Sequence, residues 1–211
     1  MDILLLVMLI LLWGLVHSLL ASLKAKELAR QFFGPAADRF YRLAYNLFAG
    51  VSFLAVLAAA ALLPGRELYR VPLPWSLLML AGQFLALLAL LIGFRQSRPM
   101  EFLGLQQALS SEETPGGLTI SGLYRYVRHP LYTAGLALLW LTPWMTTHIL
   151  AINIGATIYI VIGAYFEERK LRREFGQEYA DYAAVTPMFI PFLSELQKVL
   201  FTIKTRSHKE S

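Results

Sequence analysis

Cysteine is absent from this chain of 211 residues, and charged residues make up only 16% of it. Without cysteine there is no disulfide, no thiolate-bound zinc or iron–sulfur cluster, and no cysteine nucleophile. A water-soluble domain averages about 25% charged residues, so this chain has too few to cover a soluble surface. The hydrophobic fraction of 57% and the mean hydropathy of +0.54 instead predict one all-α, membrane-embedded unit over residues 1–211.

Charge-free apolar runs predict where the chain crosses the membrane. A bilayer core of ~30 Å needs ~20 apolar residues in a helix. The last run, 130–166, is 37 residues long, which at ~1.5 Å per residue is almost two bilayers. We therefore expect a hairpin of two short helices, turning near 142–148 where Pro143 can end the first helix. The five predicted spans are residues 3–23, 43–64, 74–94, 130–144 and 148–166.

The first span and the basic residues predict how the chain sits in the membrane. The chain begins with Met-Asp, whereas a secretory signal begins with basic residues, so we expect the first span to be a helix of the mature protein. Lys and Arg concentrate on the cytoplasmic side. The five spans place 17 of the 19 on one side and only Arg66 and Arg70 on the other. The N-terminus is thus predicted outside and the C-terminus in the cytoplasm, at a bacterial inner membrane.

Two long segments outside the spans both fall on the predicted cytoplasmic side. Their composition gives an apolar stretch, a Ser/Glu/Pro/Gly hinge and two amphipathic helices. Thr186-Pro187 is expected to end the first amphipathic helix. The four pieces are residues 102–109, 110–117, 167–182 as a continuation of the fifth span, and 194–204.

Functional groups are scarce inside the predicted spans. His17 is the one ionisable side chain there that could serve a proton path, and we expect it to be a packed, hydrogen-bonded histidine. A proton-coupled transporter is therefore disfavoured, as is any soluble nucleotide site, because the chain has no glycine-rich phosphate loop after a strand. It has no His-Glu-x-x-His motif either, and we expect neither a metal nor a nucleic-acid partner.

Polar residues gather at two predicted cytoplasmic edges. The first is 121–135, with the sequence SGLYRYVRHPLYTAG. Pro130 fits the first turn of the fourth span, so Arg128 and His129 are expected in a bent entry segment at the membrane surface. The helix start that follows can hold a carboxylate or phosphate, and Gly135 permits close approach of a ligand or another helix. The competing interpretation is an interfacial anchor, where Arg and Tyr are common.

The second edge is the pair Glu167-Glu168, at the exit of the fifth span. Two adjacent carboxylates beside an apolar helix are costly unless they are paired or solvated. They could simply end the span, with Glu168 paired to Arg172 four residues on. Because both edges belong to one helical hairpin and lie on the same side, we predict that they meet.

At these residues the chain resembles the membrane-integral methyltransferases, which include isoprenylcysteine carboxyl methyltransferases, phospholipid methyltransferases and the NnrU-like branch. The shared pattern is Arg-His-Pro-x-Tyr at 128–132, Glu-Glu at 167–168, Phe-Gly-x-x-Tyr-x-x-Tyr at 175–182 and a Pro-containing end at 186–191. The resemblance covers about 121–191.

The chain is also similar, and more closely, to the methanethiol S-methyltransferases. The stretches that carry this likeness are LYRYVRHPLY at 123–132, TPWMT at 142–146 and FEER at 166–169. The resemblance implies S-adenosylmethionine (SAM) bound on the cytoplasmic side, with a small thiol as the methyl acceptor. By this analogy the residues that bind SAM are His129, Pro130, Tyr132, Gly135, Glu167 and Glu168.

Arg128 is the residue that we expect to act in catalysis. A permanent guanidinium suits an anionic acceptor, whether thiolate or carboxylate. Lipid-like acceptors remain open in the same class, namely a prenylcysteine carboxylate or a phospholipid amine. Two other classes are also open: an NADPH-dependent membrane reductase, and a non-catalytic NnrU-like membrane partner in nitrogen-oxide metabolism. The sequence leaves the oligomeric state open.

Overall fold

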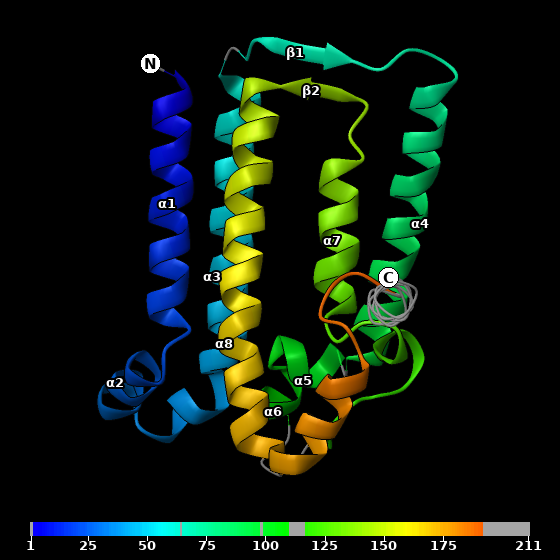
Figure 1. The fold of residues 1–211 in the computed structure, drawn as a ribbon. Coiled ribbons are helices and arrows are strands. Elements are labelled where there is room, and N and C mark those ends of the chain that lie inside the picture. Colours follow the sequence, from blue (N-terminus) through cyan, green and yellow to red (C-terminus); the bar gives the residue numbers. More distant parts are fainter. Residues whose placement is uncertain (1, 64, 98, 110–116, 192–211) are drawn as a thin grey trace, which may run out of the picture.

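The computed structural model describes residues 2–63, 65–97, 99–109 and 117–191 (Figure 1). Within these residues the fold is all-α, apart from one small two-stranded sheet. Four helices are long and apolar enough to cross a membrane, which confirms the predicted class of integral membrane protein. They are α1 (Asp2–Leu20), α3 (Pro35–Leu62), α4 (Trp75–Gln96) and α8 (Thr147–Val185).

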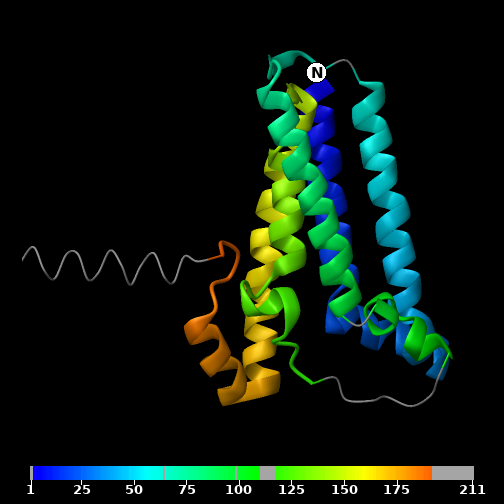
Figure 2. The same ribbon diagram turned by 90° about the vertical axis from the view of Figure 1, so that its right-hand side faces the viewer.

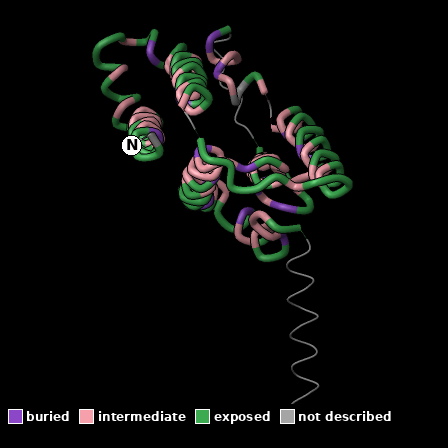
Figure 3. Tube along the Cα trace, turned by 90° about the horizontal axis from the view of Figure 1, so that it is seen from above, coloured by how far each residue is buried: buried purple, intermediate pink, exposed green. Residues whose placement is uncertain are grey.

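The outer faces of these helices carry large exposed apolar side chains. Leu11 on α1, Leu54 on α3 and Leu85 on α4 are each more than 60% exposed. Seen from above, buried positions are few and scattered along the helices (Figure 3). A soluble protein rarely exposes so much contiguous apolar surface, so these faces suit the acyl chains of lipids.

The predicted fourth span is shorter than expected. It is helix α7, Pro130–Trp140, with 11 residues rather than the predicted 130–144, or about 16 Å of helix. Polar side chains from the neighbouring helices explain where it stops. Gln83 donates to the carbonyl of Leu138 at 2.9 Å, and Asn153 donates to that of Leu139 at 2.8 Å. These donors satisfy carbonyls that a helix end leaves free. In the described residues, four of the five predicted spans thus lie in long apolar helices, and the fourth corresponds to the shorter apolar helix α7.

The hairpin turn between α7 and α8 contains a strand that the sequence did not predict. Strand β2 (Trp144–Thr146) pairs antiparallel with β1 (Glu67–Arg70). Each strand is too short to show a period-two pattern. Together they link the α3–α4 connection to the α7–α8 turn at one end of the bundle (Figure 1).

The connections at the other end are more helical than predicted. The stretch before the second span forms helix α2 (Leu23–Phe33), capped by the Ser22 hydroxyl, and α3 then starts at Pro35 instead of residue 43. The predicted interfacial stretch 102–109 lies in two short helices, α5 (Pro99–Leu103) and α6 (Leu105–Leu109). Most of the predicted hinge, residues 110–116, and the predicted piece 194–204 lie outside the described residues.

Helix α8 runs through the bundle and continues past it, as predicted. Its exposed extension turns at Gly176, where φ is +54° and ψ is −122°, a conformation that favours glycine. The chain then folds back toward the bundle and the helix ends before Thr186 (Figure 2). Helix α1 packs on α3 and α8, and α4 packs along α7. The polar edges 121–135 and 167–168 therefore come together at the end opposite the sheet.

Candidate active site

The segment that leads into α7 is tied to two other parts of the chain. It forms a short 3₁₀ helix, η1 (Gly122–Arg125), and the Leu123 amide donates to the Gln96 side chain at the end of α4. A Cβ atom at Gly122 would push the Gln96 amide out of this position, and Gly122 has a φ of +63°, which favours glycine. On the other side, the Tyr182 hydroxyl donates to the Tyr124 carbonyl at 2.6 Å. The segment is thus held in one shape before the helix starts.

Helix α7 starts as the sequence predicted, with Pro130 in its first turn and His129 before it in a non-helical conformation. The returning chain after α8 runs across this start. The His129 amide donates to the Met188 carbonyl at 3.1 Å, and the Thr133 hydroxyl donates to the Phe189 carbonyl at 2.8 Å. Residues 187–189 therefore cover one side of the α7 N-terminus.

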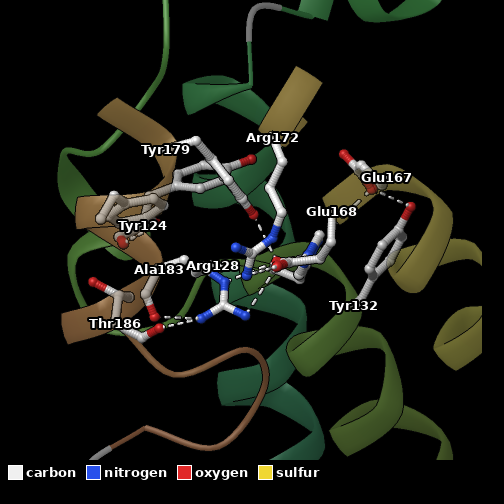
Figure 4. A network of polar contacts seen from close by, with 11 residues as sticks. Tyr124, Arg128, Tyr132, Glu167, Glu168, Arg172, Tyr179, Ala183 and Thr186 are labelled. Atoms are coloured by element: carbon white, nitrogen blue, oxygen red, sulfur yellow. Dashed lines mark hydrogen bonds and ion pairs between the residues drawn. The ribbon is translucent and has the colours of Figure 1, made fainter. Parts of the chain in front are cut away.

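Arg128 and Glu168 form the centre of the network in Figure 4. The guanidinium donates from Nε to Glu168 Oε1 at 2.8 Å and from Nη2 to Oε2 at 3.0 Å. This paired geometry is the strong form of an Arg–carboxylate contact. Its third nitrogen, Nη1, donates to the carbonyls of Ala183 and Thr186. The two predicted edges therefore meet, and Arg128 joins both of them to the end of α8.

Glu168 receives two further hydrogen bonds. The Tyr179 hydroxyl donates to Oε1 at 2.6 Å, and His129 Nε2 lies 3.0 Å from the same atom. The alternative partner, Arg172, is 4.0 Å away, so the main ion pair is with Arg128. Burial alone would raise the pKa of the Glu168 carboxyl, but the hydrogen bonds from Arg128, Tyr179 and His129 and the charge of Arg128 bring that pKa below its ordinary value.

Glu167 is in a different environment from its neighbour. Its side chain is 44% exposed, against 10% for Glu168. The Tyr132 hydroxyl donates to Oε2 at 2.9 Å, and His129 Nδ1 lies 3.7 Å from that atom. Within the described part of the chain, the other carboxylate oxygen has no hydrogen-bond partner. Glu167 therefore has a free acceptor atom for a ligand, whereas Glu168 is fully engaged by the protein.

Open space lies beside the predicted ligand-facing glycine. A Cβ atom added at Gly135 would meet no neighbouring atom within 4 Å. Gly135 is on α7, one turn beyond Tyr132, whose ring stacks on that of His129 with centroids 5.3 Å apart. Four of the six residues predicted to bind a cofactor thus contact one another, namely His129, Tyr132, Glu167 and Glu168. Pro130 and Gly135 lie beside them on α7, and we call this set of six residues the polar mouth.

An apolar groove of about 400 Å³ lies elsewhere, between α1 and α8 near the sheet. Its lining includes Val7, Ile10 and Ile154, and Thr147 is the polar residue in it. The groove offers no charged group to a zwitterionic cofactor such as SAM, so the polar mouth is the better candidate for the site.

Tyr179 and Thr186 belong to the shared pattern quoted from the sequence, but neither they nor Gln96 were among the predicted site residues. Tyr179 is 1% exposed and Thr186 is 6% exposed, and both contact the central ion pair through the turn at Gly176. An unbroken helix would put Tyr179 about 16 Å beyond Glu168. The only sign of that turn in the sequence was the Phe-Gly pair at 175–176. No sequence pattern indicated that Gln96 belongs to the site.

The chain is similar to several known methyltransferases over part of its length. The chain is 35% identical over 99 residues to a methanethiol S-methyltransferase of Crocosphaera subtropica, 37% over 97 residues to that of Pseudomonas deceptionensis, and 40% over 100 residues to methanethiol S-methyltransferase 2 of Bradyrhizobium diazoefficiens. These matches cover 44–45% of this chain and 37–39% of the relatives, so the chain spans about two fifths of their length.

The other two comparisons gave no match. No protein-family model matches the chain, and no solved structure does. The relationship therefore rests on the matched stretch of about 100 residues, in a protein whose helices suit a membrane. Over that stretch the chain is a distant homologue of the methanethiol S-methyltransferases, a family of membrane methyltransferases.

Proposed function

We propose that this protein is a membrane-embedded methyltransferase that moves the methyl group of SAM to a small thiol such as methanethiol. The observation that carries the proposal is the homology to methanethiol S-methyltransferases. The geometry supports it, because the residues implied by that likeness gather at one mouth. We further propose that this mouth faces the cytoplasm, since 17 of the 19 basic residues belong to segments predicted on that side.

The residues at the mouth fit SAM. Glu167 offers an exposed carboxylate oxygen for the amino group or the ribose hydroxyls, and Tyr132 fixes the position of that carboxylate. The α7 N-terminus suits the methionine carboxylate. The open space at Gly135 allows a bulky group to approach the helix backbone. Glu168, His129 and Pro130 are proposed to hold this arrangement in place from behind.

Bound there, SAM supplies a methyl group on a sulfonium, which an acceptor thiolate can take by in-line displacement. The two ions then become neutral, so a dry pocket of low dielectric favours the step. The chain segment 187–189 and the lipid-facing helices help to exclude water. We propose that Arg128 is the cation that faces the anionic acceptor. Because its own nitrogens already have partners, it acts through its charge and its fixed position.

The test uses purified protein in detergent with radiolabelled SAM, with NADPH as the competing ligand. We expect saturable SAM binding, no NADPH binding, and transfer of the label to methanethiol. Transfer to a prenylcysteine or a phosphatidylethanolamine instead would move the protein to another branch of the class. Binding of NADPH alone would indicate a reductase, and binding of neither would favour a non-catalytic role.

Glu167→Gln is expected to weaken SAM binding by about 10- to 100-fold, the range of a lost charged hydrogen bond. The substitution keeps the shape and removes the charge. Thermal stability should change little, because the side chain is 44% exposed. Equilibrium dialysis measures the affinity, and Glu174→Gln on the exposed extension of α8 is the matched control. If the Glu167 variant bound SAM normally, this carboxylate would only mark the end of the apolar part of the helix and would not bind the cofactor.

The substitution Gly135→Ala tests whether the open space beside Gly135 is occupied by the bound cofactor. Alanine stabilises a helix interior by about 0.5–1 kcal/mol relative to glycine, and nothing blocks the added methyl group here. We expect a higher melting temperature together with weaker SAM binding. A stabilised variant with unchanged affinity would show that the space beside Gly135 does not hold the cofactor.

A further inference from the structure

Helix α2 has an exposed apolar face. Apolar residues recur along it at spacings of three and four, which places them on one face of the helix, namely Ala25, Leu28, Ala29 and Phe32. The side chains of Leu28, Phe32 and the neighbouring Phe33 are each more than half exposed, and no residue of α2 is buried. Large apolar side chains are costly to leave in water, so this face needs an apolar partner.

The flanking helices place α2 at the membrane surface. Helix α1 has 19 residues, about 28 Å, so it ends near the boundary of a ~30 Å bilayer core. Helix α3 has 28 residues, about 42 Å, and therefore extends beyond the core. The charged residues of α3 all lie within 38–42, so the excess is at the end next to α2. Figure 1 shows α2 at the foot of both helices, packed against α3.

Two sets of contacts fix α2 at this depth. In the last turn of α1, His17 Nε2 lies 2.6 Å from the Tyr45 hydroxyl of α3, and the His17 ring stacks on Trp13 with centroids 4.9 Å apart. These contacts confirm the predicted packed, hydrogen-bonded histidine and join the end of α1 to α3. On α2 itself, Arg30 forms an ion pair of 3.2 Å with Asp38 of α3. The helix is therefore held beside the start of α3.

Basic side chains border the apolar face of α2. At about 100° per residue, Lys24 and Lys26 fall on its two sides, and Glu27 falls opposite it. Residues 23–42 carry five basic and two acidic side chains, which favours an anionic partner. Arg30 is already paired. Within the described part of the chain, neither lysine has an ion-pair partner, so both are open to an anion.

We propose that α2 lies in the plane of the membrane surface and binds anionic phospholipids. Its apolar face enters the boundary between headgroups and acyl chains, while Lys24 and Lys26 hold the lipid phosphates. The excess of positive charge favours anionic over zwitterionic headgroups. Lipid is favoured over a protein partner because α1 and α3 place the apolar face at the depth of the lipid itself.

The absence of cysteine allows one reporter to be attached at a chosen position. Phe32→Cys carries the environment-sensitive fluorophore NBD on the apolar face, and Glu27→Cys carries it on the opposite face. Both proteins are reconstituted in vesicles of phosphatidylcholine with a minor share of phosphatidylglycerol. We expect the label at position 32 to emit as in an apolar medium and to be protected from aqueous iodide. The label at position 27 should be quenched by iodide.

Trace amounts of spin-labelled lipid then identify the lipid next to α2. Spin-labelled phosphatidylglycerol should quench the label at position 32 about fivefold more effectively than spin-labelled phosphatidylcholine, the enrichment expected for one basic side chain near the surface. Replacing both Lys24→Gln and Lys26→Gln should make the two lipids nearly equal. Lys170→Gln on the exposed extension of α8 is the matched control and should keep the preference.

Each contrary outcome contradicts a particular part of the proposal. Equal quenching by iodide at positions 32 and 27 would overturn the position of α2 in the membrane surface. Protection from iodide without quenching by either lipid would mean that protein, such as a second copy of the chain, covers the face. Equal quenching by the two lipids would overturn the binding of anionic lipid, and a preference that survives loss of both lysines would overturn their role. None of these measurements involves methyl transfer, so they are independent of the proposed function.

Discussion

Glu168→Gln is expected to destabilise the protein by about 3 kcal/mol, as for removal of one partner from a buried ion pair. Glutamine keeps the shape, but its amide nitrogen is a donor that faces the Arg128 guanidinium, itself a donor, at either oxygen position. The Arg128 and Glu168 side chains are only 12% and 10% exposed, so water compensates little. Thermal unfolding in detergent measures the loss, and Glu174→Gln on the exposed part of α8 is the control.

The same network should respond to acid. The folded protein lowers the pKa of Glu168, so its stabilising contribution is fully present above the ordinary carboxyl pKa. As the pH falls below that value, the unfolded chain takes up the proton first, and the contribution is lost as the pH falls through the folded-state pKa. The difference in stability between wild type and Glu168→Gln should therefore shrink in acid. A difference that is constant with pH would mean that the glutamine acts through its shape alone.

Arg128→Ala is expected to nearly abolish methyl transfer, by 100-fold or more, and about 100-fold is a loss of about 2.7 kcal/mol of transition-state stabilisation. Arg128→Lys keeps the charge but cannot make the paired contact with Glu168, so it should retain a small fraction of the activity. SAM affinity should change less than turnover. Initial rates with saturating SAM and methanethiol measure the effect.

Arg125 provides the matched control for Arg128. It lies three residues earlier in the same segment and is exposed, so Arg125→Lys should be almost silent. Because Arg128 also holds Ala183 and Thr186, the melting temperature of each variant must be followed beside its rate. Normal turnover by a folded Arg128→Ala protein, or equal damage at Arg125, would assign the basic residues to membrane anchoring and place acceptor activation elsewhere.

The long helices and the meeting of the two edges could be predicted from the sequence, because charge-free runs and a shared hairpin are local patterns. The turn into α7 was also predictable, since Pro130 fixes it. The early end of α7 was not, because it depends on Gln83 and Asn153 from other helices. The pairing of β1 with β2 likewise joins segments more than 70 residues apart. Each strand has only three or four residues, which is too few to show a periodic pattern in the sequence.

Within the site, the sequence indicated which residue types matter but not how they divide the work. Glu167 and Glu168 are equivalent in the sequence, and only the three-dimensional arrangement makes one exposed and the other buried. The sequence placed Tyr179 on the apolar face of an amphipathic helix, and it is buried, whereas Gln177 and Glu178 before it are exposed. Its contact with Glu168 depends on the turn at Gly176, which a periodicity argument passes over.

The turn at Gly176 also fixes when the site can form during synthesis. Helices α1, α3 and α4 and the part of α8 before residue 176 all precede it, so they can enter the membrane before the returning chain exists. Until residues 179–189 have been made, Arg128 lacks the carbonyls of Ala183 and Thr186, and Glu168 lacks the Tyr179 hydroxyl. A nascent chain that stops before residue 179 therefore contains every proposed SAM-binding residue, yet it lacks the contacts that hold them together.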